Sequence, residues 1–298
     1  MIGIFTTCDK RPEFIEWQVR TFAKFLTDSY ELNILNNGSS PELAARIASE
    51  CERLCVKHHR VENPRYDDPN MACAHPLQWC WNTIIPKTDY DYIVIIDSDM
   101  FLLQEFSIID YLKGFDIAAV KQRRGDAKYI WPGLMFINRT TLPDQPSVSF
   151  MYGIVAGSRV DPGGYFHHYF LKHPEVKLRN ILHTSHIHSK NNNLSVIPRE
   201  LRDSYDEEFC LELYEHSFLH YGRSSNWDNM DATYHIRKTK FVQSFIDRRL
   251  SDAAAIEPYE YVYQYNNWLE VPNPRDGHPL TDRNQRQSWL QRIFRLSH

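Results

Sequence analysis

Short apolar runs alternate with amphipathic stretches through the first hundred residues, and this alternation constrains the fold more than any other feature. The clearest run, Tyr92 to Ile96, has the length and β-branched composition of a strand buried on both faces. Shorter runs of this kind cover residues 2–7 and 32–35, and residues 55–61 could form a third strand. Apolar residues at helical spacing cover 12–26 and 41–54, and residues 71–85 have helical content. This pattern predicts an α/β fold in which helices flank a mostly parallel central sheet.

The pattern changes beyond about residue 115. Strand-like runs at 115–120 and 133–137 follow one another without long helices between them, and loops rich in Gly, Pro and Asn come next. We find no internal repeat and no low-complexity linker. We therefore expect one continuous domain over 1–240 with a loop-rich second half, divided at about residue 110, and a C-terminal helical extension over 241–298.

Composition excludes some function classes and suggests a compartment. The chain has 34 Lys and Arg against 38 Asp and Glu, a net charge of −4, which argues against a nucleic-acid partner. Six cysteines without CxxC spacing and no signal-peptide pattern indicate a cytoplasmic protein. No apolar run approaches the roughly 20 residues of a membrane-spanning helix.

Two acidic residues follow the clearest strand. Asp97 and Asp99 are separated by one serine, directly after the apolar run that ends at Ile96. Ligands of open α/β sheets bind beyond the carboxyl ends of the strands, so both acids are expected where a ligand would lie. Two carboxylates this close repel each other, and a divalent cation relieves the repulsion. A solvated Asp-rich turn is the alternative interpretation, which the preceding buried strand disfavours.

Because Asp97 and Asp99 follow a buried strand, and because other segments match in the same chain order, the sequence resembles the GT-A class of glycosyltransferases. The resemblance covers about residues 1–230 and implies a GT-A, Rossmann-like fold with a nucleotide-binding half (1–110) and an acceptor half (111–240). It also implies Mn²⁺ or Mg²⁺ as cofactor, a nucleotide-diphosphate sugar as donor, and a carbohydrate or glycoconjugate acceptor. The matching segments are Ile4 to Thr7, Leu35 to Ser39, Asp97 to Asp99, Asp161 to Gly164, Phe218 to Gly222 and Ser225 to Trp227.

The resemblance implies a role for each matching residue. Asp99 would bind the metal directly, Asp97 would face the ribose or the metal through water, and His220 would complete the metal site. A core or surface histidine is the alternative for His220. The nucleobase and ribose would lie against Thr6, Thr7 and Asn37, and a loop containing Arg223, Ser225 and Asn226 would close over the diphosphate.

Asp161 is the candidate general base. An inverting transfer needs a carboxylate that takes the proton of the acceptor hydroxyl, and Gly163 and Gly164 would let a sugar approach the backbone closely. Asp-Pro-Gly-Gly is also a favourable turn sequence, so a purely structural role is the alternative. A retaining enzyme would not need this base. Tyr165, Phe166, His167 and His168 follow the turn and are candidates for the acceptor side, and His75 is a candidate for the donor side.

Other functions fit the sequence less well. A phosphatase of the haloacid-dehalogenase type places its DxD motif near the first strand, with Thr or Val where this chain has Phe101. A sugar nucleotidylyltransferase opens with a glycine-rich phosphate loop, which residues 4–11 lack. A non-catalytic carbohydrate-binding protein derived from a transferase could lose the metal acids, which are both present here.

Two further segments have open interpretations. His183, His186 and His188 could bind zinc, although a strand with one solvated face, or contact with an acceptor, explains them better. Residues 281–298 carry four arginines beside Trp289 and Phe294, which suits peripheral contact with an anionic membrane. Packing of this segment on the same domain or on a partner is the favoured alternative.

Overall fold

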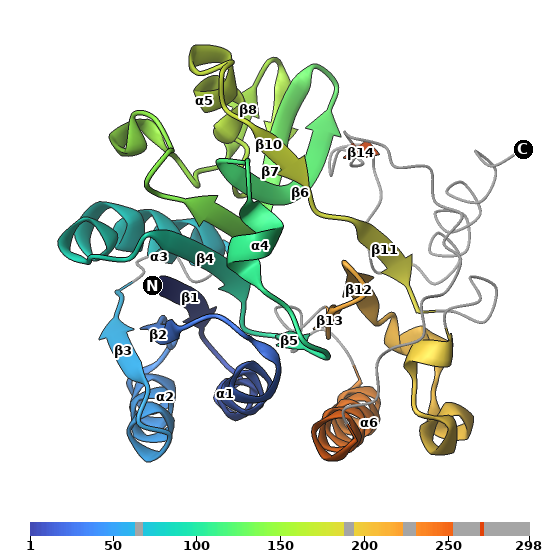
Figure 1. Cartoon of the computed structure of the whole chain (residues 1–298). Coiled ribbons are helices and arrows are strands. Elements are labelled where there is room, and N and C mark those ends of the chain that lie inside the picture. The colour runs from blue at the N-terminus through green and yellow to red at the C-terminus, as the bar shows by residue number, and fades with distance from the viewer. Residues whose placement is uncertain (63–67, 188–193, 223–230, 253–268, 271–298) are drawn as a thin grey trace, which may run out of the picture.

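The chain is built around a central sheet of eight strands. Figure 1 shows the computed structural model, with helices packed around this sheet. The structure describes residues 1–62, 68–187, 194–222, 231–252 and 269–270. The strands lie in the order β10-β6-β7-β4-β1-β2-β3, and β14 pairs with β6. Their bounds are β1 (Ile2–Cys8), β2 (Tyr30–Asn36), β3 (Lys57–Arg60), β4 (Tyr92–Asp97), β6 (Ile117–Arg124), β7 (Ala127–Asn138), β10 (Leu178–Asn180) and β14 (Leu269–Glu270).

Helices cover both faces of this sheet. One face packs against α1 (Glu13–Phe25), α2 (Pro41–Arg53) and α4 (Ile108–Leu112), and the other packs against α3 (Pro69–Thr83) and α5 (Phe166–Lys172). Proline stands in the first turn of α2 and α3, where its missing N–H costs nothing, and Ser40 and Asp68 cap these helices. The three long helices match the predicted ranges to within about two residues at each end.

The sheet is mostly parallel, as predicted. Strand β1 pairs in parallel with β2 and β4, β2 with β3, and β6 with β10 and β14. Strand β7 is antiparallel to both β4 and β6. Strands β6 and β7 form a long hairpin that extends beyond the predicted ranges, because polar residues such as Lys121 and Lys128 continue the pairing past the apolar core.

A second, four-stranded antiparallel sheet lies beside the central one. It has the order β11-β12-β13-β5, with β5 (Met100–Leu102), β11 (His183–His186), β12 (Glu212–Tyr214) and β13 (Phe218–His220). Strand β5 continues the chain directly from β4 through the Asp97–Asp99 turn, so this turn joins the two sheets (Figure 1). A separate hairpin pairs β8 (Gly153–Val155) with β9 (Ser158–Val160).

Helix α6 (Ala232–Ser251) packs against α1 and the small sheet. Its buried residues run from Tyr234 to Arg249, and Arg20 of α1 forms an ion pair with Asp247. The boundary expected at residue 240 therefore falls inside a helix that packs on α1 and the small sheet, because its buried residues continue across that position.

Some expectations concern residues outside the described ranges. These are the loop residues Arg223, Ser225 and Asn226, the third histidine of the proposed zinc group, His188, and the amphipathic segment 281–298. Within the described residues, no helix combines the length and the apolarity needed to cross a membrane.

Candidate active site

The carboxyl ends of β1, β2 and β4 bring the first site residues together. Thr7 is the register partner of Asp97 across the β1–β4 pair, and the Asn37 N–H donates to the Cys8 carbonyl across β1 and β2. The three strands are parallel, so these residues lie at one edge of the sheet. Thr7, Asn37 and Asp97 are therefore neighbours at this edge.

The Asp97–Asp99 turn is held by hydrogen bonds to its backbone. Gln18 of α1 is fully buried, and its amide donates to the carbonyl oxygens of Asp97 (2.9 Å) and Met100 (3.2 Å). From the other side, the Tyr221 N–H donates to the Asp99 carbonyl (2.8 Å). Buried carbonyl groups need such partners. The backbone of the turn is thus held from two sides, by α1 and by the residue after β13.

His220 joins the two aspartates through strand pairing. Antiparallel pairing of β5 with β13 places His220 opposite Met100, the residue that follows Asp99. Its Nε2 lies 3.3 Å from Asp99 Oδ1, and one ligand atom from each of Asp97, Asp99 and His220 lies within 4.8 Å of the others. Carboxylate oxygens and an imidazole nitrogen are suitable ligands for Mn²⁺ or Mg²⁺. The donor set therefore fits a divalent cation.

The charges in this group depend on one another. Burial, together with the neighbouring Asp99, raises the pKa of Asp97 to about 7 against an opposing effect of His220. Burial lowers the pKa of His220, but Asp99 and Glu212 outweigh it and hold this pKa well above its usual value. Without a cation, the site thus retains protons that a bound cation would displace.

Other carboxylates gather around the same place. Burial raises the pKa of the Cys73 thiol, and Asp97, Asp161 and Asp9 raise it further, so all three carboxylates lie near this residue of α3. Burial also raises the pKa of Asp9, with a smaller contribution from Asp99. Asp9 was not predicted as a site residue. Its place directly after the first strand is the signal that could have found it.

Thr6 and Thr7 face opposite sides of the sheet. Side chains alternate along a strand, so Thr6 shares the face of Ile4 and Cys8, which packs against α1 and α2. Thr7 shares the opposite face with Phe5, toward α3. The two threonine side chains therefore point into different layers of the fold.

Three polar atoms near the α3 face have no partner among the described residues. They are Thr7 Oγ1, Asn37 Oδ1 and His75 Nδ1. The Asn37 amide is oriented by the bond from its Nδ2 to the Ala72 carbonyl of α3 (2.9 Å). Buried polar atoms without partners in the protein are candidates for ligand contacts.

Asp161 is paired with a buried arginine. Arg124, only 5% exposed, donates from Nη1 to Asp161 Oδ1 (3.0 Å) and from Nη2 to Oδ2, so both carboxylate oxygens accept hydrogen bonds. The same Nη1 donates to the Arg159 carbonyl (2.9 Å). This bidentate geometry fixes the start of the turn.

The two glycines after Asp161 serve the packing of the turn. Gly163 has a φ of 85°, and a Cβ there would stand 2.2 Å from the Ile130 carbonyl oxygen, while a Cβ at Gly164 would meet Val160 at 2.0 Å. The room that the sequence suggested for a sugar is thus occupied by β7 and β9. This geometry agrees with the structural alternative for the Asp-Pro-Gly-Gly segment.

The segment that follows divides between core and surface. Phe166 is fully buried, and His167 Nδ1 accepts a hydrogen bond from the Lys128 N–H (3.1 Å). Tyr165 and His168 contact each other and face a hollow of about 220 Å³, which is also lined by Ser147, Ser149, Tyr169 and Lys172. Two of the four candidates for the acceptor side, Tyr165 and His168, thus line this hollow.

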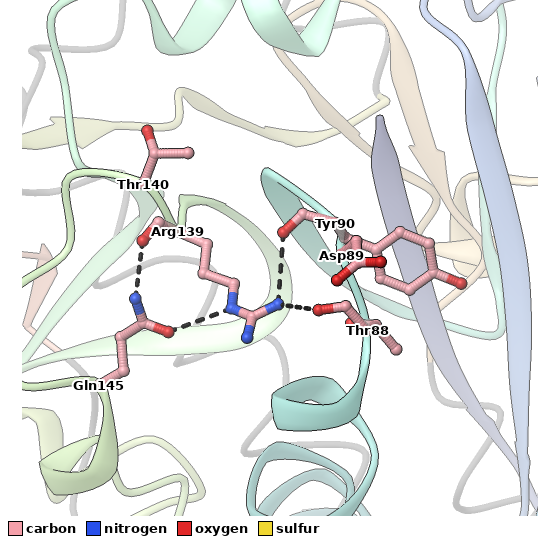
Figure 2. A pocket seen from close by; sticks show the side chains of 6 residues that line it. All are labelled: Thr88, Asp89, Tyr90, Arg139, Thr140 and Gln145. Carbon is pink, nitrogen blue, oxygen red and sulfur yellow. Dashed lines mark hydrogen bonds between the residues drawn. The ribbon is translucent and has the colours of Figure 1, made fainter.

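A larger hollow of about 390 Å³ lies away from the carboxyl ends of β1, β2 and β4. Its residues precede β4 or follow β7, at the opposite end of these strands from Asp97. Figure 2 shows Arg139 donating to the Thr88 and Tyr90 carbonyl oxygens and to Gln145, whose amide donates back to the Arg139 carbonyl. These polar groups satisfy one another and tie chain segments together.

Two residues near His220 were also missed by the sequence analysis. No motif in the sequence marks Glu212, yet its Oε2 lies 2.7 Å from His220 Nδ1. Trp131 stacks on Tyr214 and lies 5.5 Å from His220 between ring centroids. Only the pairing of distant strands brings them to the site.

Several solved structures are similar to this chain over part of their length. The mannosyltransferase PcManGT from Pyrobaculum calidifontis, solved with GDP-Man and Mn²⁺, has 12% identity and a TM-score of 0.42, over 60% of this chain and 54% of that one. The galactosyltransferase LgtC, solved with donor and acceptor sugar analogs, has 13% identity and a TM-score of 0.33, over 49% of this chain and 62% of that one. S. aureus TarS 1-349, solved with UDP, has 11% identity and a TM-score of 0.33, over 50% of this chain and 49% of that one.

This chain thus spans about half to three-fifths of the length of these solved structures. No protein-family model matches the sequence, and no curated protein matches it.

Proposed function

We propose that this chain is a metal-dependent glycosyltransferase that moves a sugar from a nucleotide-diphosphate sugar to a carbohydrate or glycoconjugate acceptor. The observation that carries the proposal is the group of Asp97, Asp99 and His220, whose ligand atoms lie within 4.8 Å of one another at the carboxyl end of β4. A Mn²⁺ or Mg²⁺ ion held there would act as a Lewis acid on the diphosphate of the donor and its departing phosphate.

Residues around this group would contact the nucleoside and hold the metal-binding turn in place. Thr7 Oγ1 and Asn37 Oδ1 are unpaired acceptors among the described residues, and we assign them to hydroxyl and N–H groups of the nucleoside. Gln18 keeps the turn rigid through two backbone carbonyls, so the carboxylates are oriented before a donor binds.

For Asp161 we propose a structural role in its turn. Arg124 occupies both carboxylate oxygens, and both following glycines are explained by close packing against β7 and β9. A general base must be able to reach the proton that it removes. The geometry therefore supports Asp161 as the anchor of the turn rather than as the base of an inverting reaction.

A thermal-shift screen of nucleotide sugars with and without Mn²⁺ tests the proposed function. A ligand that binds only the folded state raises the melting temperature. We expect one nucleotide sugar to stabilise the chain only when Mn²⁺ is present, and we expect Asp99→Asn to lose this response. Stabilisation of equal size without metal, or a full response of Asp99→Asn, would contradict the metal assignment.

A further inference from the structure

Glu212 lies directly beside His220 in the small antiparallel sheet. The two residues are register partners on β12 and β13, so their side chains share one face of the sheet. Glu212 Oε2 lies 2.7 Å from His220 Nδ1, within the range of a strong hydrogen bond to a carboxylate. The other ring nitrogen, Nε2, lies 3.3 Å from Asp99 Oδ1.

The two ring nitrogens of His220 thus have different neighbours. When Nδ1 keeps its proton and donates it to Glu212, the lone pair of a neutral imidazole is on Nε2. Nε2 is the nitrogen on the side of Asp99, where the candidate metal group lies. A carboxylate partner on the second nitrogen fixes both the tautomer and the orientation of a metal-binding histidine.

Glu212 and the imidazole are themselves held in place. The Tyr214 hydroxyl donates to the same Glu212 Oε2 (3.1 Å), and Tyr214 stacks on Trp131 with centroids 5.4 Å apart and planes at 29°. Trp131 also contacts the His220 ring. These contacts restrict rotation of both the carboxylate and the imidazole.

The backbone of β7 places Trp131 in this position. Ala119 of β6 pairs with Met135, but the next residue, Val120, pairs with Trp131, so β7 bulges between these two positions. Within the bulge, a Cβ at Gly133 would stand 2.0 Å from the Trp131 ring, which therefore lies against the bare backbone. Bulges commonly redirect a side chain in this way.

We propose that Glu212 is a positioning residue, which accepts a hydrogen bond from the Nδ1–H of His220 and so leaves the lone pair of Nε2 for the cation of Asp97 and Asp99. The inference rests on the proposed function, because it requires that cation. It adds a residue that acts through His220.

The test measures Mn²⁺ affinity of the full chain without any nucleotide, from free Mn²⁺ in electron paramagnetic resonance titrations. Glu212→Leu removes the acceptor, and we expect it to weaken Mn²⁺ binding about 10- to 100-fold. Glu212→Gln keeps an oxygen that can accept the Nδ1 proton, so it should restore most of the affinity. Glu208→Leu is the matched control, since Glu208 is exposed nearby on the same stretch of chain.

A second measurement does not depend on the folding of any Glu212 variant. In the wild-type chain labelled with ¹⁵N-histidine and saturated with Mg²⁺, His220 should carry its proton on Nδ1, with His220→Ala used to assign the signal. A proton on Nε2, or a Glu212→Leu variant that binds Mn²⁺ as tightly as Glu208→Leu, overturns the inference. If the wild-type chain binds no Mn²⁺, the metal assignment of the proposed function itself fails, which is a distinguishable result.

Discussion

The two sheets contribute to the candidate site in different ways. The parallel strands β1, β2 and β4 supply Thr7, Asn37 and Asp97 from their carboxyl ends, each close in sequence to an apolar run. The small antiparallel sheet supplies His220 and Glu212, which reach the site only because β13 pairs with β5 and β12 pairs with β13.

This difference suggests that the two sheets bind different parts of the ligand. The parallel edge offers unpaired polar atoms suited to a nucleoside, whereas the antiparallel sheet offers charged and hydrogen-bonded groups suited to holding a cation. Asp97 and Asp99 lie at the junction of the two sheets, so substitutions there should affect both tasks. Substitutions on either side should affect only one.

The largest effect is expected at the junction. Asp99→Asn removes a carboxylate that is 3% exposed and belongs to the metal group, so donor turnover should fall on the order of 10²- to 10³-fold. Release of nucleoside diphosphate from the donor identified by the screen is the measurement. Turnover equal to that of the wild-type chain would remove Asp99 from the mechanism.

His220→Ala tests the antiparallel side alone. Loss of the imidazole should weaken Mn²⁺ binding on the order of 100-fold, because one of three ligand groups is gone. Binding of the free nucleoside to the parallel edge should change less than about threefold. Calorimetric titrations with Mn²⁺ and with the nucleoside measure the two effects separately, and equal losses of both would contradict the division between the sheets.

Asp161→Asn should act on stability. Arg124 would keep its buried charge but lose a charged partner, which costs about 2 kcal/mol of unfolding free energy. Urea denaturation measures this loss, and Mn²⁺ affinity at a temperature where the variant is folded should equal that of the wild-type chain. A normal stability combined with a large loss of transfer activity would instead favour the general-base role.

Mn²⁺ affinity should rise about tenfold between pH 6 and pH 8. Burial, together with Asp99, raises the pKa of Asp97 to about 7, so below this pH a proton competes with the cation for the carboxylate. Burial lowers the pKa of His220, but Asp99 and Glu212 raise it well above its usual value, so competition at Nε2 has the same sign. Affinities measured at several pH values check the trend, which should be shallower in Asp97→Asn.

Thr7→Val should have the smallest effect. It keeps the shape of the side chain and removes one unpaired hydroxyl, so nucleoside binding should weaken by about 2- to 10-fold. Thr6→Val provides the matched control, because Thr6 faces α1 and α2. Equal effects of the two substitutions on nucleoside affinity would show that strand alternation does not decide the contact.

Much of the central fold could be predicted from short-range patterns. Apolar periodicity predicted α1 and α2, helical content predicted most of α3, and the continuous apolar run predicted β4 with the acids beyond it. These features depend on residues a few positions apart, so they can be predicted from the sequence alone. The full length of the β6–β7 hairpin and the continuation of α6 past residue 240 could not be predicted, because polar residues make up part of both elements.

By itself, the sequence determined the alternating α/β core and the placement of Asp97 and Asp99 at the end of a buried strand. Only the tertiary structure decided that Thr6 and Thr7 face opposite layers, that Arg124 holds Asp161, and that Glu212 supports His220. The reason is physical. Apolar periodicity is a local property of the chain, whereas the partner of a polar side chain depends on strand register and on pairing between distant segments.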